Sequence, residues 1–176
     1  MTAVARPVAG PEGRAAISPD EFRSVFRGHP AGVAVVAMRD GERPVGFTAT
    51  SVISVSADPP LLAFSLATTS SSWPAVARAS TVAVSFLAHD QADLSARFAT
   101  SGVDRFADGG WHALDSGEPV IDGAAAWVRA RVVERTAVGS SHLVTLHAVR
   151  RHVRDGASPL VFHDRGYHRL GDRSRV

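Results

Sequence analysis

The stretch from Gly46 to Pro60 constrains the fold of this chain more than any other segment. It places the β-branched residues Val52, Ile53 and Val55 beside a run of small hydroxyl residues, and it closes on Asp-Pro-Pro. β-Branched residues favour an extended backbone, whereas a double proline cannot pair in a strand ladder and turns the chain. We therefore expect a rigid strand that stops at the two prolines.

The start of this strand has side chains small enough for a flat ligand to lie against the backbone: Thr48, Ala49, Thr50 and Ser51. Their hydroxyls and free N–H groups can donate to the ring nitrogens and carbonyl oxygens of such a ligand. The segment thus suits a planar cofactor better than a hydrophobic core. Taken alone, an ordinary strand with threonines on a solvent face is an equally good interpretation.

Closely spaced strand patterns with few helices predict a mainly β fold, a closed or nearly closed antiparallel barrel with a few short helices. Asp40-Gly41 is a hairpin signal, and residues 99–118 are expected to be a loop. The expected helices start at Ser18 and span 72–79 and 89–98, with Leu94 and Phe98 facing inward in the last. The expected strands are 32–38, 44–56, 61–66, 81–87, 124–136, 142–154 and 160–162.

The first helix has a clear start signal. Ser18 is a candidate N-cap, Pro19 occupies the first helical position and Glu21 completes a capping box. Phe22, Val25 and Phe26 follow at helical spacing, so we expect them to pack in the core.

The composition predicts one globular domain, residues 17–176, after a disordered tail of residues 1–16. Hydrophobic residues make up 45% of the 176 residues, and cysteine is absent, which removes disulfides and thiolate chemistry. The net charge of +2 supplies no strong field for nucleic acid. Neither a membrane-spanning apolar run nor an N-terminal signal region is found, so we expect a cytoplasmic protein that contacts no membrane.

A second group of hydroxyl residues precedes the predicted helix at 72–79. Thr69, Ser71 and Ser72 stand immediately before it, and Ser65 lies on the preceding strand. Hydroxyls ahead of a helix N-terminus form a ready anion site, although Ser72 could equally be a plain N-cap in a polar turn.

The stretch 46–60 resembles the flavin-binding segment of the flavin reductase-like family, small reductases with an FMN-binding split-barrel fold. The resemblance covers roughly residues 18–170, because other segments occur in the same order along the chain. They are Pro30-Ala31-Gly32-Val33, Thr69-Ser70-Ser71-Ser72-Trp73-Pro74, Ser95-Ala96-Arg97-Phe98-Ala99, Asp104-Arg105-Phe106, Gly139-Ser140-Ser141-His142, Pro159-Leu160-Val161-Phe162 and Gly166-Tyr167.

The resemblance implies an antiparallel split β-barrel and an NAD(P)H:flavin oxidoreductase. Such an enzyme transfers hydride from NADH or NADPH to FMN or FAD and supplies reduced flavin to a partner flavin-dependent monooxygenase. It also implies a homodimer with flavin at the subunit interface. The strand start from Thr48 to Ser51 is expected along the isoalloxazine edge, and the hydroxyls of Ser65, Thr69, Ser71 and Ser72 near the flavin phosphate.

Two positions depart from the family pattern. Many members carry Lys or Arg in the phosphate turn where this chain has Thr68 and Thr69, so Arg105 is our candidate for the missing charge. A loop ion pair with Asp104 or Asp108 is the alternative for Arg105. The family turn Gly-Asp-His reads Gly139-Ser140-Ser141-His142 here, with an insertion and no acid.

His142 is the candidate catalytic residue on the nicotinamide side, where it could contact NAD(P)H, donate a proton or cap the turn. Tyr167 stands where the family often has an aromatic near the nicotinamide. Arg150, Arg151 and Arg154 form a small basic cluster that is either a solvated face or a phosphate contact.

No metal site is expected, because the spacing of the histidines fits no zinc pattern. Two other functions stay open on the sequence alone. One is a flavin-retaining redox enzyme of the same fold that acts on a small molecule, which the altered His142 turn favours. The other is a non-enzymatic flavin-binding module.

Overall fold

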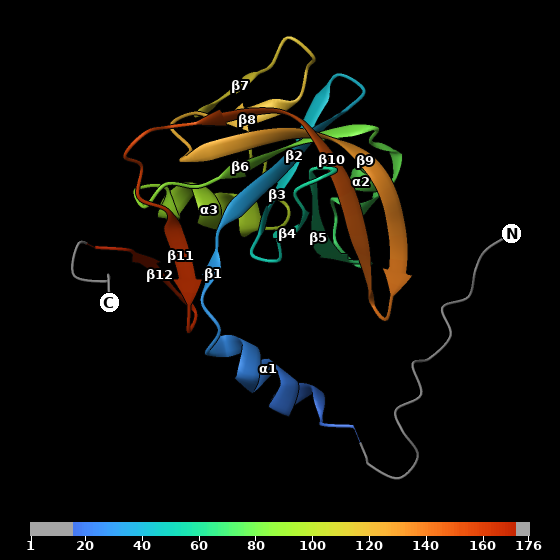
Figure 1. The fold of residues 1–176 in the computed structure, drawn as a ribbon, viewed down its shortest axis with the longest axis vertical. Coiled ribbons are helices and arrows are strands. Elements are labelled where there is room, and N and C mark those ends of the chain that lie inside the picture. The colour runs from blue at the N-terminus through green and yellow to red at the C-terminus, as the bar shows by residue number, and fades with distance from the viewer. Residues whose placement is uncertain (1–15, 172–176) are drawn as a thin grey trace, which may run out of the picture.

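The computed structural model describes residues 16–171, so the predicted tail lies outside them except for its last residue. Its main unit is a strongly curled antiparallel sheet (Figure 1) in the order β3-β2-β6-β9-β10-β5-β4. The mainly β, antiparallel fold with few helices is therefore confirmed. The strands of this sheet are β2 (Ala34–Asp40), β3 (Arg43–Ala49), β4 (Ile53–Ser56), β5 (Leu61–Ala67), β6 (Thr81–Phe86), β9 (Ala126–Val138) and β10 (Ser141–Val153).

Two smaller sheets complete the β structure. The first has the order β1-β11-β12, and the second pairs β7 with β8. The sequence pattern missed β7, β8 and β12, because runs of three or four residues carry too little periodicity to stand out. Their bounds are β1 (Ala31–Gly32), β7 (Trp111–Ala113), β8 (Pro119–Ile121), β11 (Leu160–His163) and β12 (Gly166–Arg169).

The two edge strands of the large sheet, β3 and β4, are joined by residues 50–52 alone. The expected single strand 44–56 is therefore wrong: the chain leaves one edge of the sheet and enters the other. At the break, the Ser51 hydroxyl donates to the Ser65 carbonyl at 3.0 Å and accepts from the Ser65 N–H at 3.1 Å. The Ser51 side chain thus makes the two hydrogen bonds to the Ser65 backbone that a neighbouring strand would otherwise make.

The hydrophobic core lies on both faces of β2. Val36 and Met38 belong to the cluster inside the curled sheet, together with Phe64 of β5. Val35 and Ala37 point the other way, into a cluster that includes Phe98. This alternation is the two-residue period of a strand, and burial on both faces explains why β2 reads as a continuous apolar run.

In the described part of the chain, three helices flank the sheets: α1 (Pro19–Arg27), α2 (Trp73–Arg78) and α3 (Ala92–Ala99). The predicted capping box at Ser18 and Glu21 is present. The predicted helix 89–98 begins three residues late, at Ala92, but Phe98 is buried and Leu94 packs against the same cluster, as expected. No helix among residues 16–171 is long and apolar enough to cross a membrane.

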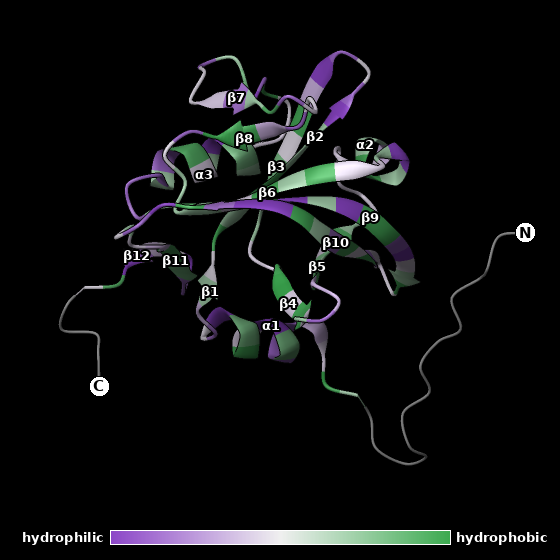
Figure 2. Cartoon of the chain, turned by 45° about the horizontal axis from the view of Figure 1, so that its top comes forward, coloured by the Kyte–Doolittle hydropathy of each residue, from purple (hydrophilic) through white to green (hydrophobic). Residues whose placement is uncertain are grey.

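The expected core role of the α1 stripe is wrong. Phe22, Val25 and Phe26 are 53%, 65% and 56% exposed. The cause is the position of α1, which stands apart from the curled sheet on the side where β4 lies (Figures 1 and 2). The helix is amphipathic, but within residues 16–171 its apolar face stays exposed.

A buried ion pair fixes the small β7-β8 sheet to the main sheet. Glu118, 3% exposed, accepts from the Arg129 Nε at 2.9 Å. Burial alone would raise the pKa of this carboxyl, but hydrogen bonds from Arg129, Ser116 and Thr81 and from its own backbone lower the pKa to about 2. The carboxylate therefore stays charged in the folded protein at neutral pH.

Candidate active site

A cavity of about 360 Å³, called the inner cavity below, opens between the end of β3, the loop after β5 and the segment that follows α3. Its lining includes four of the residues expected to bind a cofactor: Thr48, Thr69, Ser71 and Arg105. Phe47, Leu66 and Phe98 supply apolar wall. Apolar walls with a few converging polar groups are typical of sites for a flat organic ligand.

A larger cavity of about 670 Å³, the outer cavity, adjoins the first. Ser71 and Arg105 belong to the linings of both, and the outer cavity adds Ser72. An elongated ligand could therefore pass from one cavity to the other along the Arg105 side chain.

Arg105 is held by carbonyl and hydroxyl oxygens and not by a carboxylate. Its Nη1 donates to the Gly46 carbonyl at 2.6 Å and to the Ser72 hydroxyl at 3.1 Å, and its Nε donates to the Thr100 carbonyl at 2.9 Å. Burial lowers the pKa of this guanidinium, which nonetheless stays charged at neutral pH.

The alternative of a loop ion pair for Arg105 is wrong. Asp108 pairs with Arg97 at 2.8 Å, and the Asp104 carboxylate accepts from the Phe106 N–H at 3.0 Å. Within the described part of the chain, Arg105 therefore carries a positive charge beside two cavities and makes no ion pair, and Asp104 is the acidic residue in the lining of the outer cavity. The Arg105 guanidinium is well suited to an anionic ligand.

Ser72 does not act as a side-chain cap. Its hydroxyl makes no hydrogen bond to the first turn of α2 and instead accepts from Arg105. Since α2 has only six residues, the positive charge at this place comes from the guanidinium and not from a helix terminus.

The other residues of the predicted flavin strand have different surroundings. Ala49 is buried in the core inside the sheet, Thr50 is exposed, and Ser51 is bound to Ser65 at the break between β3 and β4. None of these side chains lines either cavity, so any role they have in ligand binding falls to their backbone groups.

Thr48 and Tyr167 are brought together by one residue of α3. The Thr48 Oγ1 donates to the Ser95 carbonyl at 2.7 Å, and the Tyr167 hydroxyl donates to the Ser95 Oγ at 2.9 Å. Tyr167 is 37% exposed and packs edge-on against Phe162, with ring centroids 5.3 Å apart. Ser95 thus connects Thr48, which is predicted to border the flavin ring, with Tyr167, which is predicted to border the nicotinamide.

His142 lies outside the linings of both cavities. On β10 it pairs with Leu66 of β5, and its ring stacks on Trp73 at the start of α2. The Nδ1 of His142 is buried and has no hydrogen-bond partner among the described residues. The imidazole therefore packs against the start of α2 and does not line either cavity.

Gly46 is required where β3 passes the aromatic side chains behind the outer cavity. A Cβ atom at this position would lie 3.0 Å from the Phe106 ring, 3.1 Å from the Phe98 ring and 3.1 Å from the Val36 carbonyl. Only glycine lets the backbone come this close, and the same residue gives Arg105 its shortest hydrogen bond.

Sequence reasoning assigned no role to Ser95 or Gly46. A signal for Ser95 was present: it stands one helical turn before Phe98, on the inward face of a helix where an apolar residue is expected. The basic cluster Arg150, Arg151 and Arg154 lines neither cavity. No group of three His, Cys, Asp or Glu side chains in residues 16–171 is arranged to hold a metal ion.

A curled antiparallel sheet that is open between its edge strands β3 and β4, with two cavities lined by hydroxyls and by Arg105, has the architecture of a split barrel. The family model "Flavin reductase like domain" matches residues 26–171, so the chain belongs to that family.

Named relatives agree with this assignment. The chain is 42% identical over 166 residues to an NADH:FMN oxidoreductase of Rhodococcus erythropolis, covering 92% of this chain and 86% of the relative. It is 42% identical over 140 residues to the actinorhodin polyketide dimerase of Streptomyces coelicolor, covering 78% of each.

Two further similarities concern a reductase subunit and a crystal structure. The chain is 34% identical over 135 residues to the reductase subunit HsaB of a flavin-dependent monooxygenase from Mycobacterium tuberculosis, covering 77% of this chain and 72% of the relative. It superimposes on a flavin reductase domain protein from Arthrobacter with a TM-score of 0.82 at 34% identity, covering 86% of this chain and 95% of the other.

Proposed function

We propose that the protein transfers hydride from NADH or NADPH to FMN or FAD and supplies the reduced flavin to a partner flavin-dependent monooxygenase. The family membership and the names of the relatives support this reaction and this kind of partner. We further propose that it acts in the cytoplasm, where reduced nicotinamide coenzyme is available.

One observation carries the placement of the flavin: two adjoining cavities meet at Arg105, which has no carboxylate partner in the described residues. The ring would lie in the inner cavity against Thr48, with the backbone N–H groups that follow Thr48 along its edge, and Ser51 and Ser65 would bind each other outside the cavity. The phosphate would lie among Arg105 and the hydroxyls of Thr69, Ser71 and Ser72. The outer cavity has room for the adenosine of FAD, so we expect both flavins to bind.

The residues of this chain do little chemistry themselves, because a bound flavin accepts the hydride and its electron pair from the nicotinamide. Backbone N–H groups along the ring edge would steady the negative charge that builds up on the ring. Tyr167 would border the nicotinamide, and His142 would act on that side only if its ring left Trp73.

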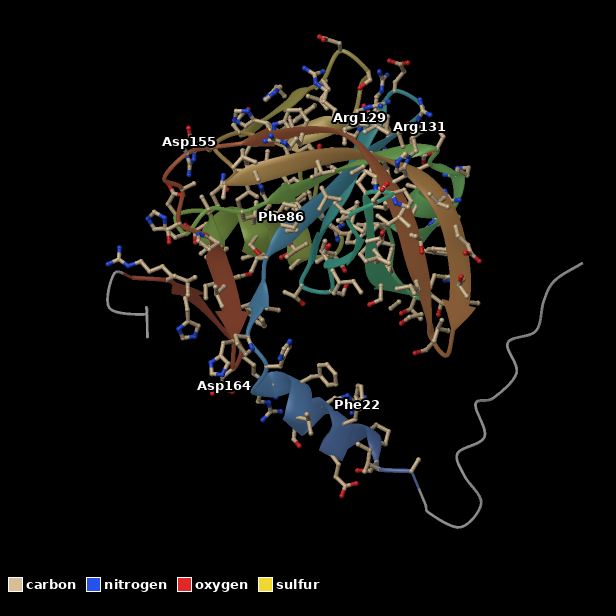
Figure 3. The ribbon with its side chains drawn as sticks, in the orientation of Figure 1. Phe22, Phe86, Arg129, Arg131, Asp155 and Asp164 are labelled. Carbon is tan, nitrogen blue, oxygen red and sulfur yellow. The ribbon has the colours of Figure 1, made fainter. Side chains whose placement is uncertain are left out.

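We also propose a homodimer. The exposed apolar face of α1 is matched by an apolar groove of about 340 Å³ whose lining includes Ile53, Phe86 and Val128. Figure 3 shows Phe22 on α1 and Phe86 in the sheet, from which α1 stands apart. Exchange of α1 between two copies would cover both apolar surfaces by one repeated contact, as in two-fold symmetric dimers.

The deciding experiment follows the NADH absorbance of purified protein mixed with NADH and FMN, FAD or riboflavin. Turnover with free flavin, saturable in both substrates, is the expected result. NADH oxidation no faster with any flavin than without one would refute the proposal. Repeating the assay with NADPH decides the coenzyme.

A flavin-retaining redox enzyme is the second candidate, favoured by the 42% identity to a polyketide dimerase and by the changed turn before His142. Gel filtration of the flavin-loaded protein separates the two. Flavin that leaves the protein on the column supports a reductase that releases its product, and flavin that stays supports the second candidate.

A further inference from the structure

Ser95 is an unusual residue for its position. It lies on α3 with its side chain facing the interior and is 0% exposed. Its helical neighbour Phe98 is equally buried, in a cluster of apolar side chains. A buried hydroxyl is costly unless it is hydrogen-bonded, so a serine here needs partners.

Its two partners come from different sheets. Thr48 is on β3 of the seven-stranded sheet, and Tyr167 is on β12 of the three-stranded sheet. No strand pairing connects β3 with β12 among the described strands, and both residues hydrogen-bond to Ser95. The Thr48 bond uses the Ser95 backbone carbonyl, whereas the Tyr167 bond uses the Ser95 side chain.

We propose that Ser95 is a positioning residue that sets the distance between the flavin and the nicotinamide. The proposal rests on the proposed function, in which Thr48 borders the ring and Tyr167 borders the nicotinamide. Hydride transfer requires the donor carbon and acceptor nitrogen to be held in contact, and a misplacement of about 1 Å can cost about 100-fold in rate. A single buried residue that holds both sides fixes that geometry before either ligand binds.

The two kinds of bond allow the two arms to be tested separately. Ser95→Ala removes the acceptor of Tyr167 but keeps the carbonyl that holds Thr48. Tyr167→Phe removes the same hydrogen bond by deleting its donor. Thr48→Val removes only the hydrogen bond from Thr48 to the Ser95 carbonyl. Ser158→Ala is the matched control, because its hydroxyl donates to the Leu170 carbonyl near the same C-terminal strand and outside the proposed site.

We expect Ser95→Ala and Tyr167→Phe each to raise the KM for NADH and to lower kcat, so that kcat/KM for NADH falls about threefold to tenfold in each variant. The flavin Kd should stay within about twofold of wild type. The double variant should be no worse than the more affected single variant, because both remove one interaction. Thr48→Val should instead raise the flavin Kd. Flavin Kd is measured by fluorescence titration.

A readout without any ligand completes the test. Tyr167 is the single tyrosine of the chain, so the tyrosine Raman doublet reports its hydrogen bonding alone. Ser95→Ala should change that doublet in flavin-free protein, and Ser158→Ala should leave it unchanged.

Different outcomes would refute the role of Ser95 and the placement of the two ligands. If Tyr167→Phe affects NADH use but Ser95→Ala does not, or if their effects multiply in the double variant, Ser95 does not position Tyr167. If neither Tyr167→Phe nor Thr48→Val changes any kinetic or binding constant, the ligands bind elsewhere. Should Ser95→Ala fail to fold, the wild-type doublet still reports whether the Tyr167 hydroxyl donates a hydrogen bond, and Tyr167→Phe reports whether loss of that bond changes the use of NADH.

Discussion

The imidazole of His142 lies flat against the indole of Trp73, with ring centroids 3.6 Å apart and planes 12° apart. This stack joins β10 to the start of α2, and Trp73 in turn packs on the core inside the sheet. Stacking needs a flat ring but no ring nitrogen, and the buried Nδ1 has no hydrogen-bond partner within residues 16–171. Replacing the imidazole by another flat ring therefore distinguishes a stacking role of His142 from a role that needs a ring nitrogen.

His142→Phe keeps a flat ring on Trp73 and removes both nitrogens. We expect kcat and the KM for NADH to stay within about threefold of wild type, and His142→Ala to lower the free energy of unfolding by about 1 kcal/mol, the scale of a lost aromatic stack. Steady-state kinetics and urea unfolding measure the two effects. A kcat of His142→Phe reduced more than about tenfold, with normal stability, would instead support proton transfer or nicotinamide contact by His142.

Arg105→Met should weaken the binding of phosphorylated flavins selectively. A hydrogen bond to a charged group contributes about 1.5–3 kcal/mol, so the Kd of FMN should rise about 10-fold to 100-fold. Riboflavin has no phosphate and serves as the internal control, with an expected change of less than about threefold. Equal losses for FMN and riboflavin would show that Arg105 only supports the loops around it.

Gly46→Ala should destabilise the protein and disturb the outer cavity. The added methyl group would have to displace two phenyl rings and a backbone carbonyl, and overpacking of this kind costs about 1–3 kcal/mol. Gly32→Ala is the control, since its Cβ would meet nothing within 4 Å. Thermal unfolding compares the two variants, and equal stability would contradict the tight approach at Gly46.

Glu118 should make the protein sensitive to acid. Its pKa is about 2 in the folded protein against an ordinary value of 4.5. Its contribution is therefore fully present above about pH 4.5 and is lost as the pH falls through about 2, an effect of about 3 kcal/mol. Urea unfolding from pH 7 to 2 measures it. The stability difference between wild type and Glu118→Gln should shrink over this window, and a constant difference would contradict the assignment.

Phe22→Asp should dissociate the proposed dimer. Burial of a phenylalanine side chain contributes about 1.5–3 kcal/mol, and a symmetric dimer loses two such contacts. Light scattering after gel filtration gives the mass. Ser24→Ala, on the same helix, should leave the mass unchanged. A wild-type protein that is monomeric at tens of micromolar, or a variant with the mass of the dimer, would rule out the α1 contact.

Local signals in the sequence predicted most of the regular structure. The capping box at Ser18 and the apolar runs of β2, β5 and β6 depend on neighbouring residues, so they can be recognised without knowledge of the fold. The exposure of Phe22 and Phe26 could not be predicted, because an amphipathic stripe indicates that a helix needs a partner surface and not where that surface is.

The functional site also combines features that the sequence reveals with features that depend on the fold. Its hydroxyl-rich segments are visible in the sequence, and three of their expected residues, Thr48, Thr69 and Ser71, line the inner cavity. The separation of Ser51 and Ser65 from that cavity depends on where the strand breaks, which a run of β-branched residues does not reveal. The role of Ser95 depends on two residues 47 and 72 positions away along the chain.

The three-residue connection between β3 and β4 leaves the chain no slack at the seam of the barrel. Both flanking strands are pinned by their ladders to β2 and β5, so a residue inserted at 50–52 must either bulge out of the connection or shift one edge strand. A shift by a single step would reverse which side chains face inward along that strand. The short connection thus helps to keep the register of both edge strands, whereas the β9-β10 hairpin tip at Gly139 could accept insertions.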